Sequence, residues 1–241
     1  MRYLTSVSFV ALGLALLPAA AQAAPVFNTG LAGPAGTYFG TGNPNTNWTV
    51  ETAGVYEFGL QASRPFLGPI TPVGNVYTAS TGLAPGFAPR WAFSFNYSYI
   101  DTSGVTTRDD LSALNLSVTD VGNGGTITFN MKNWPGAAGY DVGTTTEHGP
   151  ALGSDHGQQD STNMGFAGVA AYFLPMADPD IVNSYIFTLE AICGTGACGG
   201  DGMSLGSVSM VVNTVPEPAS MAALGVGLLG MVAIRRRRKT A

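Results

Sequence analysis

An alternation of apolar and polar residues is the clearest pattern in this chain, and it is strongest in the stretch 90–100. The odd positions from Trp91 to Tyr99 are all aromatic, whereas the even positions between them are small or polar. A period of two predicts a β-strand with one aromatic face. We interpret that face as part of the hydrophobic core; the alternative is an exposed platform on which sugar rings stack.

The same period predicts further strands. Residues 114–119 and 126–131 alternate on either side of a Gly-Asn-Gly-Gly turn, which predicts a β-hairpin. Shorter strands are expected at 48–50, 55–60, 75–78, 185–189 and 204–212. The Pro-rich stretch 63–90 and the polar, Gly-rich stretch 133–162 predict long loops. About eight strands without an internal helix predict an all-β fold, which we expect to be an antiparallel β-sandwich with jelly-roll-like connectivity.

The first residues of the chain have the organisation of a signal peptide, which we place at residues 1–23. Arg2 precedes an apolar stretch from Leu4 to Leu17, and Ala21-Gln22-Ala23 fits the small-x-small pattern of a cleavage site. The mature chain is therefore expected to begin at Ala24, after export through the Sec translocon and removal of the leader by signal peptidase.

The C-terminal segment 215–241 contains three successive parts. Pro216, Glu217 and Pro218 form a triplet whose prolines disfavour helix, so we expect an extended and accessible spacer. The apolar run 219–234 predicts a short transmembrane helix of about 24 Å. The basic residues Arg235, Arg236, Arg237, Arg238 and Lys239 then hold that end on the cytoplasmic side. The domain 24–214 is left outside the membrane.

This order of triplet, short apolar run and basic cluster resembles the C-terminal sorting signal of PEP-CTERM proteins, which in Gram-negative bacteria are processed by exosortase. The resemblance implies passage across the inner membrane as a C-terminally anchored precursor. It further implies recognition at the triplet by exosortase, followed by cleavage or transfer to the cell envelope or extracellular matrix. The alternative is an ordinary C-terminal membrane anchor.

Charge separates the exported domain from its tail. Residues 24–214 contain four basic and fourteen acidic residues, a net charge of −10. A nucleic-acid partner requires a basic surface, so this class of function is excluded. Cys193 and Cys198, in an oxidising compartment, predict one disulfide across a small loop, because a metal site would need further thiols or histidines nearby.

Two stretches offer candidate metal ligands. Glu147, His148, Asp155, His156 and Asp160 are imidazole and carboxylate groups that could hold a zinc-like ion, and the alternative is a solvated polar loop.

Asp178, Asp180 and Asn183 offer oxygen ligands for Ca²⁺, but they lack the EF-hand framework, and Pro179 favours a plain turn. Apart from this weak calcium candidate, no cofactor is expected.

Two short motifs resemble catalytic ones and are rejected. The stretch 194–199 matches G-x-G-x-x-G without the helix that a dinucleotide site needs, and 202–206 matches G-x-S-x-G without a downstream histidine. A glycosidase needs paired carboxylates, for which Glu51, Glu57 and Glu147 are available without forming a motif. No catalytic residue is therefore assigned. We expect a non-enzymatic surface or exopolysaccharide-associated protein, and the alternative is a secreted β-sandwich hydrolase or lyase that acts on glycans.

Overall fold

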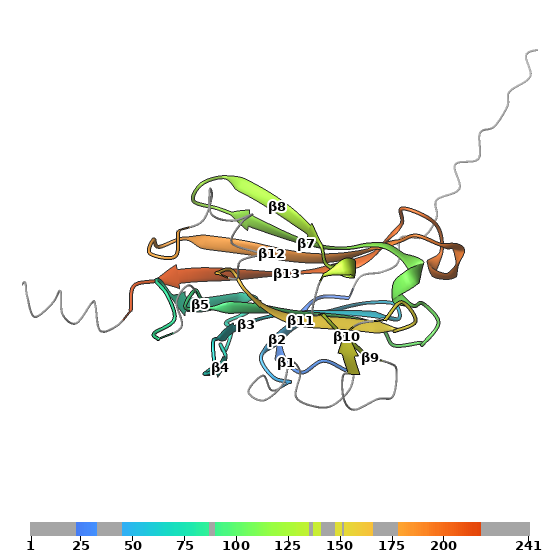
Figure 1. The fold of residues 1–241 in the computed structure, drawn as a ribbon, viewed down its shortest axis with the longest axis horizontal. Coiled ribbons are helices and arrows are strands. Elements are labelled where there is room, and N and C mark those ends of the chain that lie inside the picture. Colours follow the sequence, from blue (N-terminus) through green and yellow to red (C-terminus); the bar gives the residue numbers. More distant parts are fainter. Residues whose placement is uncertain are drawn as a thin grey trace, which may run out of the picture.

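The computed structural model describes residues 23–32, 45–86, 90–134, 137–140, 148–150, 152–165 and 178–217. These residues form β-strands and three short 3-10 turns, without an α-helix. Two sheets pack face to face as a β-sandwich (Figure 1). The all-β prediction is confirmed.

Within the described part of the chain, the larger sheet contains eight strands. They are β1 (Val26–Thr29), β2 (Trp48–Ala53), β3 (Tyr56–Arg64), β4 (Gly68–Pro69), β6 (Ser94–Asp101), β9 (Ala138–Tyr140), β10 (His148–Pro150) and β11 (Gly157–Asn163). Their order is β1-β2-β3-β6-β11-β9-β10, and β4 pairs with β3.

The smaller sheet contains five strands in the order β5-β13-β12-β7-β8. They are β5 (Val76–Ser80), β7 (Leu111–Asp120), β8 (Gly125–Asn130), β12 (Ser184–Cys193) and β13 (Ser204–Val215). The 3-10 turns are η1 (Arg108–Asp110), η2 (Met131–Asn133) and η3 (Gly196–Cys198). The predicted hairpin is the antiparallel pair β7–β8.

The aromatic side chains that precede and line β6 lie in the core between the sheets. Trp91, Phe93, Phe95, Tyr97 and Tyr99 are each at most 5% exposed. The ring of Phe95 lies 5.1 Å from that of Phe187 on the facing strand β12. Burying such a ring contributes roughly 2–3 kcal/mol to stability. The core interpretation is therefore confirmed, and the exposed sugar-stacking platform is excluded because the rings are not accessible.

The other face of β6 is buried as well, which the alternation of small polar residues did not predict. The backbone N–H of Ala32 donates to the carboxylate of Glu57, so the chain before β2 lies over the outer face of β3. Leu31, Trp48 and Val50 form a second, smaller apolar cluster there. Gly59 permits this packing, because a Cβ at that position would lie 2.4 Å from Leu31 Cδ2.

The connectivity differs from the antiparallel, jelly-roll-like sandwich expected. β5 pairs with β13 in parallel, since Val76 faces Val211 and Ser80 faces Val215. Consecutive strands also form hairpins within one sheet, as β2–β3 and β12–β13 do. The smaller sheet is therefore mixed, because its edge strand β5 pairs in parallel with β13 while the other pairs are antiparallel. The two paired segments are far apart in sequence.

The predicted loop 133–162 is wrong in part, because it contains strand β11 and the short strands β9 and β10. β11 lies inside the larger sheet, paired with β6 on one side and β9 on the other. Its sequence is polar throughout, and the amide nitrogen of its inward side chain Gln158 donates a 2.9 Å hydrogen bond to the hydroxyl of Tyr97. A strand stabilised in this way carries no hydrophobic period.

Candidate functional site

The last strand of the sandwich leads directly into the triplet, and this junction is the candidate site. β13 lies between β5 and β12, so its end is held on both sides: Val215 pairs with Ser80, and Asn213 pairs with Ser184. The carbonyl of Val215 still accepts a 2.8 Å hydrogen bond from Thr81 N–H. Pro216 and Glu217 follow at once and are exposed. Strand β13 thus ends at the residue before the triplet.

A hydrogen-bonded clamp, formed by Asp120, Asn183 and Thr214, holds this end of β13. The Thr214 N–H donates to the Asn183 carbonyl at 2.8 Å, and the Asn183 N–H donates to Thr214 Oγ1 at 2.8 Å. The Asn183 side chain donates to Asp120 Oδ1 at 2.7 Å and accepts from Gly122 N–H at 2.9 Å. The clamp therefore ties β7, β13 and the segment before β12 together beside the triplet.

The carboxylate of Asp120 is the charged member of the clamp. Burial acts to raise its pKa, but hydrogen bonds from Asn183 and Asn123 outweigh burial and hold the pKa below its usual range. Asp120 is 3% exposed, so its negative charge depends on these donors. Sequence reasoning missed this residue, since its partner Asn183 lies 63 positions along the chain.

The calcium candidates do not share one arrangement. Asn183 is buried, and its amide oxygen accepts from Gly122 and Ser184 N–H groups within the clamp. Asp178 and Asp180 are more exposed, and Asp178 Oδ1 accepts from Asp180 N–H at 2.8 Å, as in the plain turn that Pro179 favours. Within the described ranges, no three His, Cys, Asp or Glu side chains group as metal ligands do. Calcium binding stays a prediction.

The zinc candidates are only partly covered by the structure. Glu147 lies outside the described residues, and His148 is placed only by its backbone in β10. Asp155 is buried and accepts from Leu152 N–H, whereas Asp160 lies on β11 and accepts from Ser161 N–H at 2.7 Å. Both carboxylates thus stabilise local backbone.

Glu51 and Glu57, two of the candidate glycosidase carboxylates, do not form a pair. In the β2–β3 register, Glu51 faces Phe58 and Thr52 faces Glu57. Because side chains alternate along a strand, the two carboxylates point to opposite faces of the sheet. The third candidate, Glu147, is outside the described residues.

The two rejected motifs have structural roles. The stretch 194–199 forms the loop with η3 and opens no α-helix. Ser204 begins β13, and its hydroxyl donates to Glu190 Oε1 at 2.7 Å.

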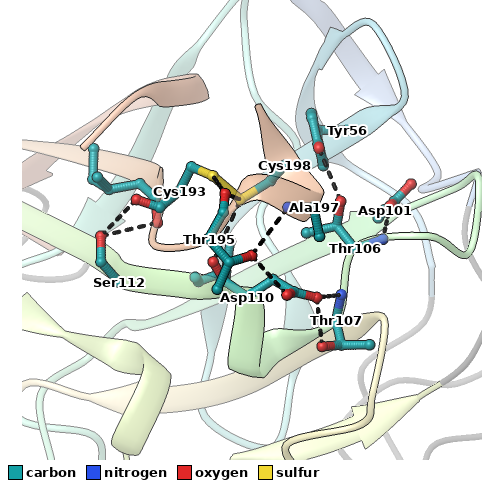
Figure 2. The surroundings of a disulfide bond; sticks show 12 residues. Tyr56, Asp101, Thr106, Thr107, Asp110, Ser112, Cys193, Thr195, Ala197 and Cys198 are labelled. Atoms are coloured by element: carbon teal, nitrogen blue, oxygen red, sulfur yellow. Dashed lines mark hydrogen bonds between the residues drawn. A yellow bond between two sulfur atoms is a disulfide. The ribbon is translucent and has the colours of Figure 1, made fainter. Parts of the chain in front are cut away.

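The disulfide between Cys193 and Cys198 is present, as predicted. It closes the loop between β12 and β13, at the end of the sandwich opposite the triplet. Thr195 in this loop donates to Asp110 Oδ1 at 2.8 Å (Figure 2). The Gly194 N–H donates to the Asp110 carbonyl at 2.7 Å. The loop is therefore fastened to η1 as well as closed on itself.

The outer face of the smaller sheet is a second feature of possible functional use, and we call it the hydroxyl face. Thr128 pairs with Ser117 at 2.8 Å, and Thr188 pairs with Ser209 at 2.8 Å. The strand register places these four hydroxyls in one row across β8, β7, β12 and β13. The next row contains a further 2.8 Å pair, Thr119–Thr126. Such pairs stabilise the sheet, and the same face also contains Ile186, Val211 and Glu190.

Several predicted positions lie outside the described residues: Ala21, Pro218, the apolar run 219–234, and Arg235 to Lys239. Ala23 and Ala24, at the expected signal-peptide cleavage site, are described and exposed. No helix in the described part of the chain is long and apolar enough to cross a bilayer.

The last strand of the folded β-domain runs into an exposed Pro-Glu segment, and an apolar run and a basic cluster follow in the sequence. This is the organisation of a protein with a C-terminal sorting signal. Residues 214–238 match the family model described as the PEP-CTERM protein-sorting motif. The chain therefore carries this motif, as the resemblance implied, and the match supports an exported protein processed by exosortase. Comparison with curated proteins and with solved structures finds no match.

Proposed function

We propose that this chain is an exported, non-catalytic component of the cell envelope or extracellular matrix, and that exosortase processes it at the triplet Pro216, Glu217 and Pro218. One observation carries the proposal: the matched motif starts at residue 214, which is the clamped end of β13, and the triplet follows two residues later. A protease cleft binds extended backbone, and the prolines keep the triplet extended.

Glu217 is the residue of the triplet that offers charge for recognition. It is the only charged residue between Asp201 and Arg235. Its exposed carboxylate stands just outside the proposed membrane span, where a cationic pocket of a membrane protease can reach it. A neutral residue at this position would bind such a pocket more weakly, because charge-assisted hydrogen bonds are roughly twice as strong as neutral ones.

The membrane steps involve both ends of the chain. The Sec translocon exports the chain, and signal peptidase cleaves after Ala23. The run 219–234 spans the inner membrane as a helix, while Arg235 to Lys239 stay on the cytoplasmic side. Exosortase then releases or transfers the domain.

At its destination the domain associates with exopolysaccharide. The hydroxyl face supports this role, because rows of hydroxyl groups offer hydrogen bonds to a neutral glycan. The hydroxyls already pair across the strands, so their geometry is fixed before a glycan binds. Such preorganisation lowers the entropic cost of association.

The test is Glu217→Ala in the native host, read by membrane fractionation and by mass spectrometry of terminal peptides. Export and signal-peptide removal should remain normal, while the C-terminal tail stays attached and the protein stays in the membrane. Glu217→Gln should fail in the same way if the charge is recognised. Asp201→Ala, which removes an exposed carboxylate at the other end of the sandwich, is the matched control and should be processed normally. Normal tail removal in Glu217→Ala would reduce the triplet to a spacer and leave an ordinary anchor.

A further inference from the structure

The distance between the sandwich and the membrane is set by a very short connection. β13 ends at Val215, and the apolar run begins at Ala219. Four extended residues span at most about 14 Å. Because Thr81 and Ser80 hold Val215 in the sheet, the chain cannot lengthen this connection without breaking strand pairs. In the anchored precursor, the end of the sandwich at Val215 must therefore lie close to the lipid headgroups.

The turn between β3 and β4, residues 64–67, lies at this same end. The Tyr77 hydroxyl contacts the Leu60 carbonyl at 3.2 Å, and Tyr77 pairs with Val212 of β13. At the other end, a Cβ on Gly206 of β13 would lie 2.8 Å from Phe58. β3 and β13 thus run in the same direction on facing sheets, and their ends lie on the same side of the molecule (Figure 1).

This turn presents two large apolar side chains to solvent. Phe66 is 66% exposed and Leu67 is 77% exposed. Phe66 also has a φ of 62°, a left-handed conformation that costs a bulky residue about 1–2 kcal/mol. A strained backbone that holds an aromatic ring out of the core is unfavourable for an isolated soluble domain and points to a use for the ring.

Basic residues flank the apolar pair. Arg64 is exposed at the end of β3, and the guanidinium carbon of Arg90 lies 5.0 Å from the centre of the Phe66 ring. They are two of the four basic residues between positions 24 and 214. This end also contains acidic residues: Asp120 is buried in the clamp, Asp178 and Asp180 precede β12, and Glu217 follows β13. Aromatic and aliphatic side chains beside arginines are the composition that binds the interface of an anionic bilayer.

We propose that the turn 64–67 rests in the headgroup region of the bilayer that holds the anchor, with Phe66 and Leu67 inserted and Arg64 on anionic lipid phosphates. This inference rests on the proposed function, since it needs run 219–234 in the membrane. The contact fixes the orientation of the sandwich in the precursor, and with it the position of the triplet at the membrane surface. Once the tail is removed, one shallow turn is too small an anchor to retain the domain.

Photocrosslinking of the full-length chain tests the contact. Leu67 is replaced by benzoylphenylalanine in one sample, and Val105 is replaced in the matched control. Val105 is 64% exposed, in the loop after β6 at the opposite end of the sandwich. Each chain is reconstituted into liposomes of phosphatidylethanolamine and phosphatidylglycerol, illuminated and extracted with alkali. Lipid adducts are then identified by mass spectrometry in the fraction that resists extraction.

The expected result is a lipid adduct at position 67 and none at position 105 in the alkali-resistant fraction. Resistant protein without an adduct at position 67, or with equal adducts at both positions, overturns the inference and leaves the membrane anchor intact. Protein that alkali extracts completely overturns the anchor itself, and the inference falls with it. The two failures are therefore distinguishable in one experiment.

Discussion

The side-chain amide of Asn183 donates a 2.7 Å hydrogen bond to Oδ1 of Asp120, a residue 63 positions earlier in the chain. This bond joins the end of β7 to the segment before β12. The backbone of Asn183 in turn holds Thr214, two residues before the triplet. The matched motif therefore begins at a residue that the folded domain holds in its sheet.

Asn183→Ala should lower the free energy of unfolding by about 2–4 kcal/mol, because it leaves a buried carboxylate without one of its donors and two N–H groups without an acceptor. Urea unfolding of the purified chain measures the change. Asn133→Ala, which truncates an exposed amide, is the control and should fall within about 0.5 kcal/mol of the parent. Equal stability of the two variants would show that the clamp contributes nothing.

Two buried aspartates predict a loss of stability in acid. Burial acts to raise the pKa of Asp101, but hydrogen bonds from Ser103 and Thr106 outweigh it and leave the pKa lowered. The pKa of Asp120 is lowered by its donors in the same way. The unfolded chain therefore takes up protons at the ordinary Asp pKa of about 4, where the folded chain does not.

This stabilisation is fully present above that pH and is lost as the pH falls through the lower, folded-state pKa values. The free energy of unfolding should therefore be lower at about pH 3 than at about pH 7. Asp101→Asn should be less stable at neutral pH and should show a shallower decline in acid. Identical unfolding curves of the parent at the two pH values would contradict the assignment.

The disulfide should make a modest contribution to stability. Labelling of the purified protein without reductant should find no free thiol at Cys193 or Cys198. The double variant Cys193→Ser/Cys198→Ser should lose about 2 kcal/mol, the amount expected for a short closed loop. Thr195→Val keeps the disulfide and removes the hydrogen bond to Asp110. It therefore separates the stability that comes from closing the loop from the stability that comes from attaching the loop to η1. Quantitative labelling of both cysteines would rule out the bond.

The hydroxyl face predicts a specific loss of glycan association. Thr188→Glu places a charge in the middle of the hydroxyl row, so co-sedimentation with exopolysaccharide from the native host should fall while the melting temperature changes little. Thr52→Glu, at an exposed position on β2 of the other sheet, is the matched control. Equal binding by the two variants would place the glycan contact elsewhere.

Local sequence patterns predicted most of the strands. The β7–β8 hairpin, β6, β12 and β13 follow from alternation, because each buries one apolar face against the other sheet. β11 was missed, because its stability comes from buried amides and hydroxyls and from neighbours on both sides. The parallel pairing of β5 with β13 was also missed, since no local pattern specifies a partner so distant.

The same distinction holds at the candidate site. The triplet was predictable because its residues are adjacent and their order along the chain is the signal. The clamp was not, because Asp120, Asn183 and Thr214 meet only after three strands have assembled. Asn183 was only a weak calcium candidate from sequence, and its amide in the structure fastens β7 to the segment before β12. Folding, and not sequence spacing, gives the residue this role.

The central claim is that both terminal signals are removed and that the sandwich alone reaches the envelope. The most direct test is the intact mass of the protein recovered from its native envelope, with its terminal peptides sequenced. The account predicts a chain that begins at Ala24 and lacks the segment from Ala219 to Ala241. A mature protein that still carries Arg235 to Lys239 would contradict it and establish a permanent C-terminal anchor.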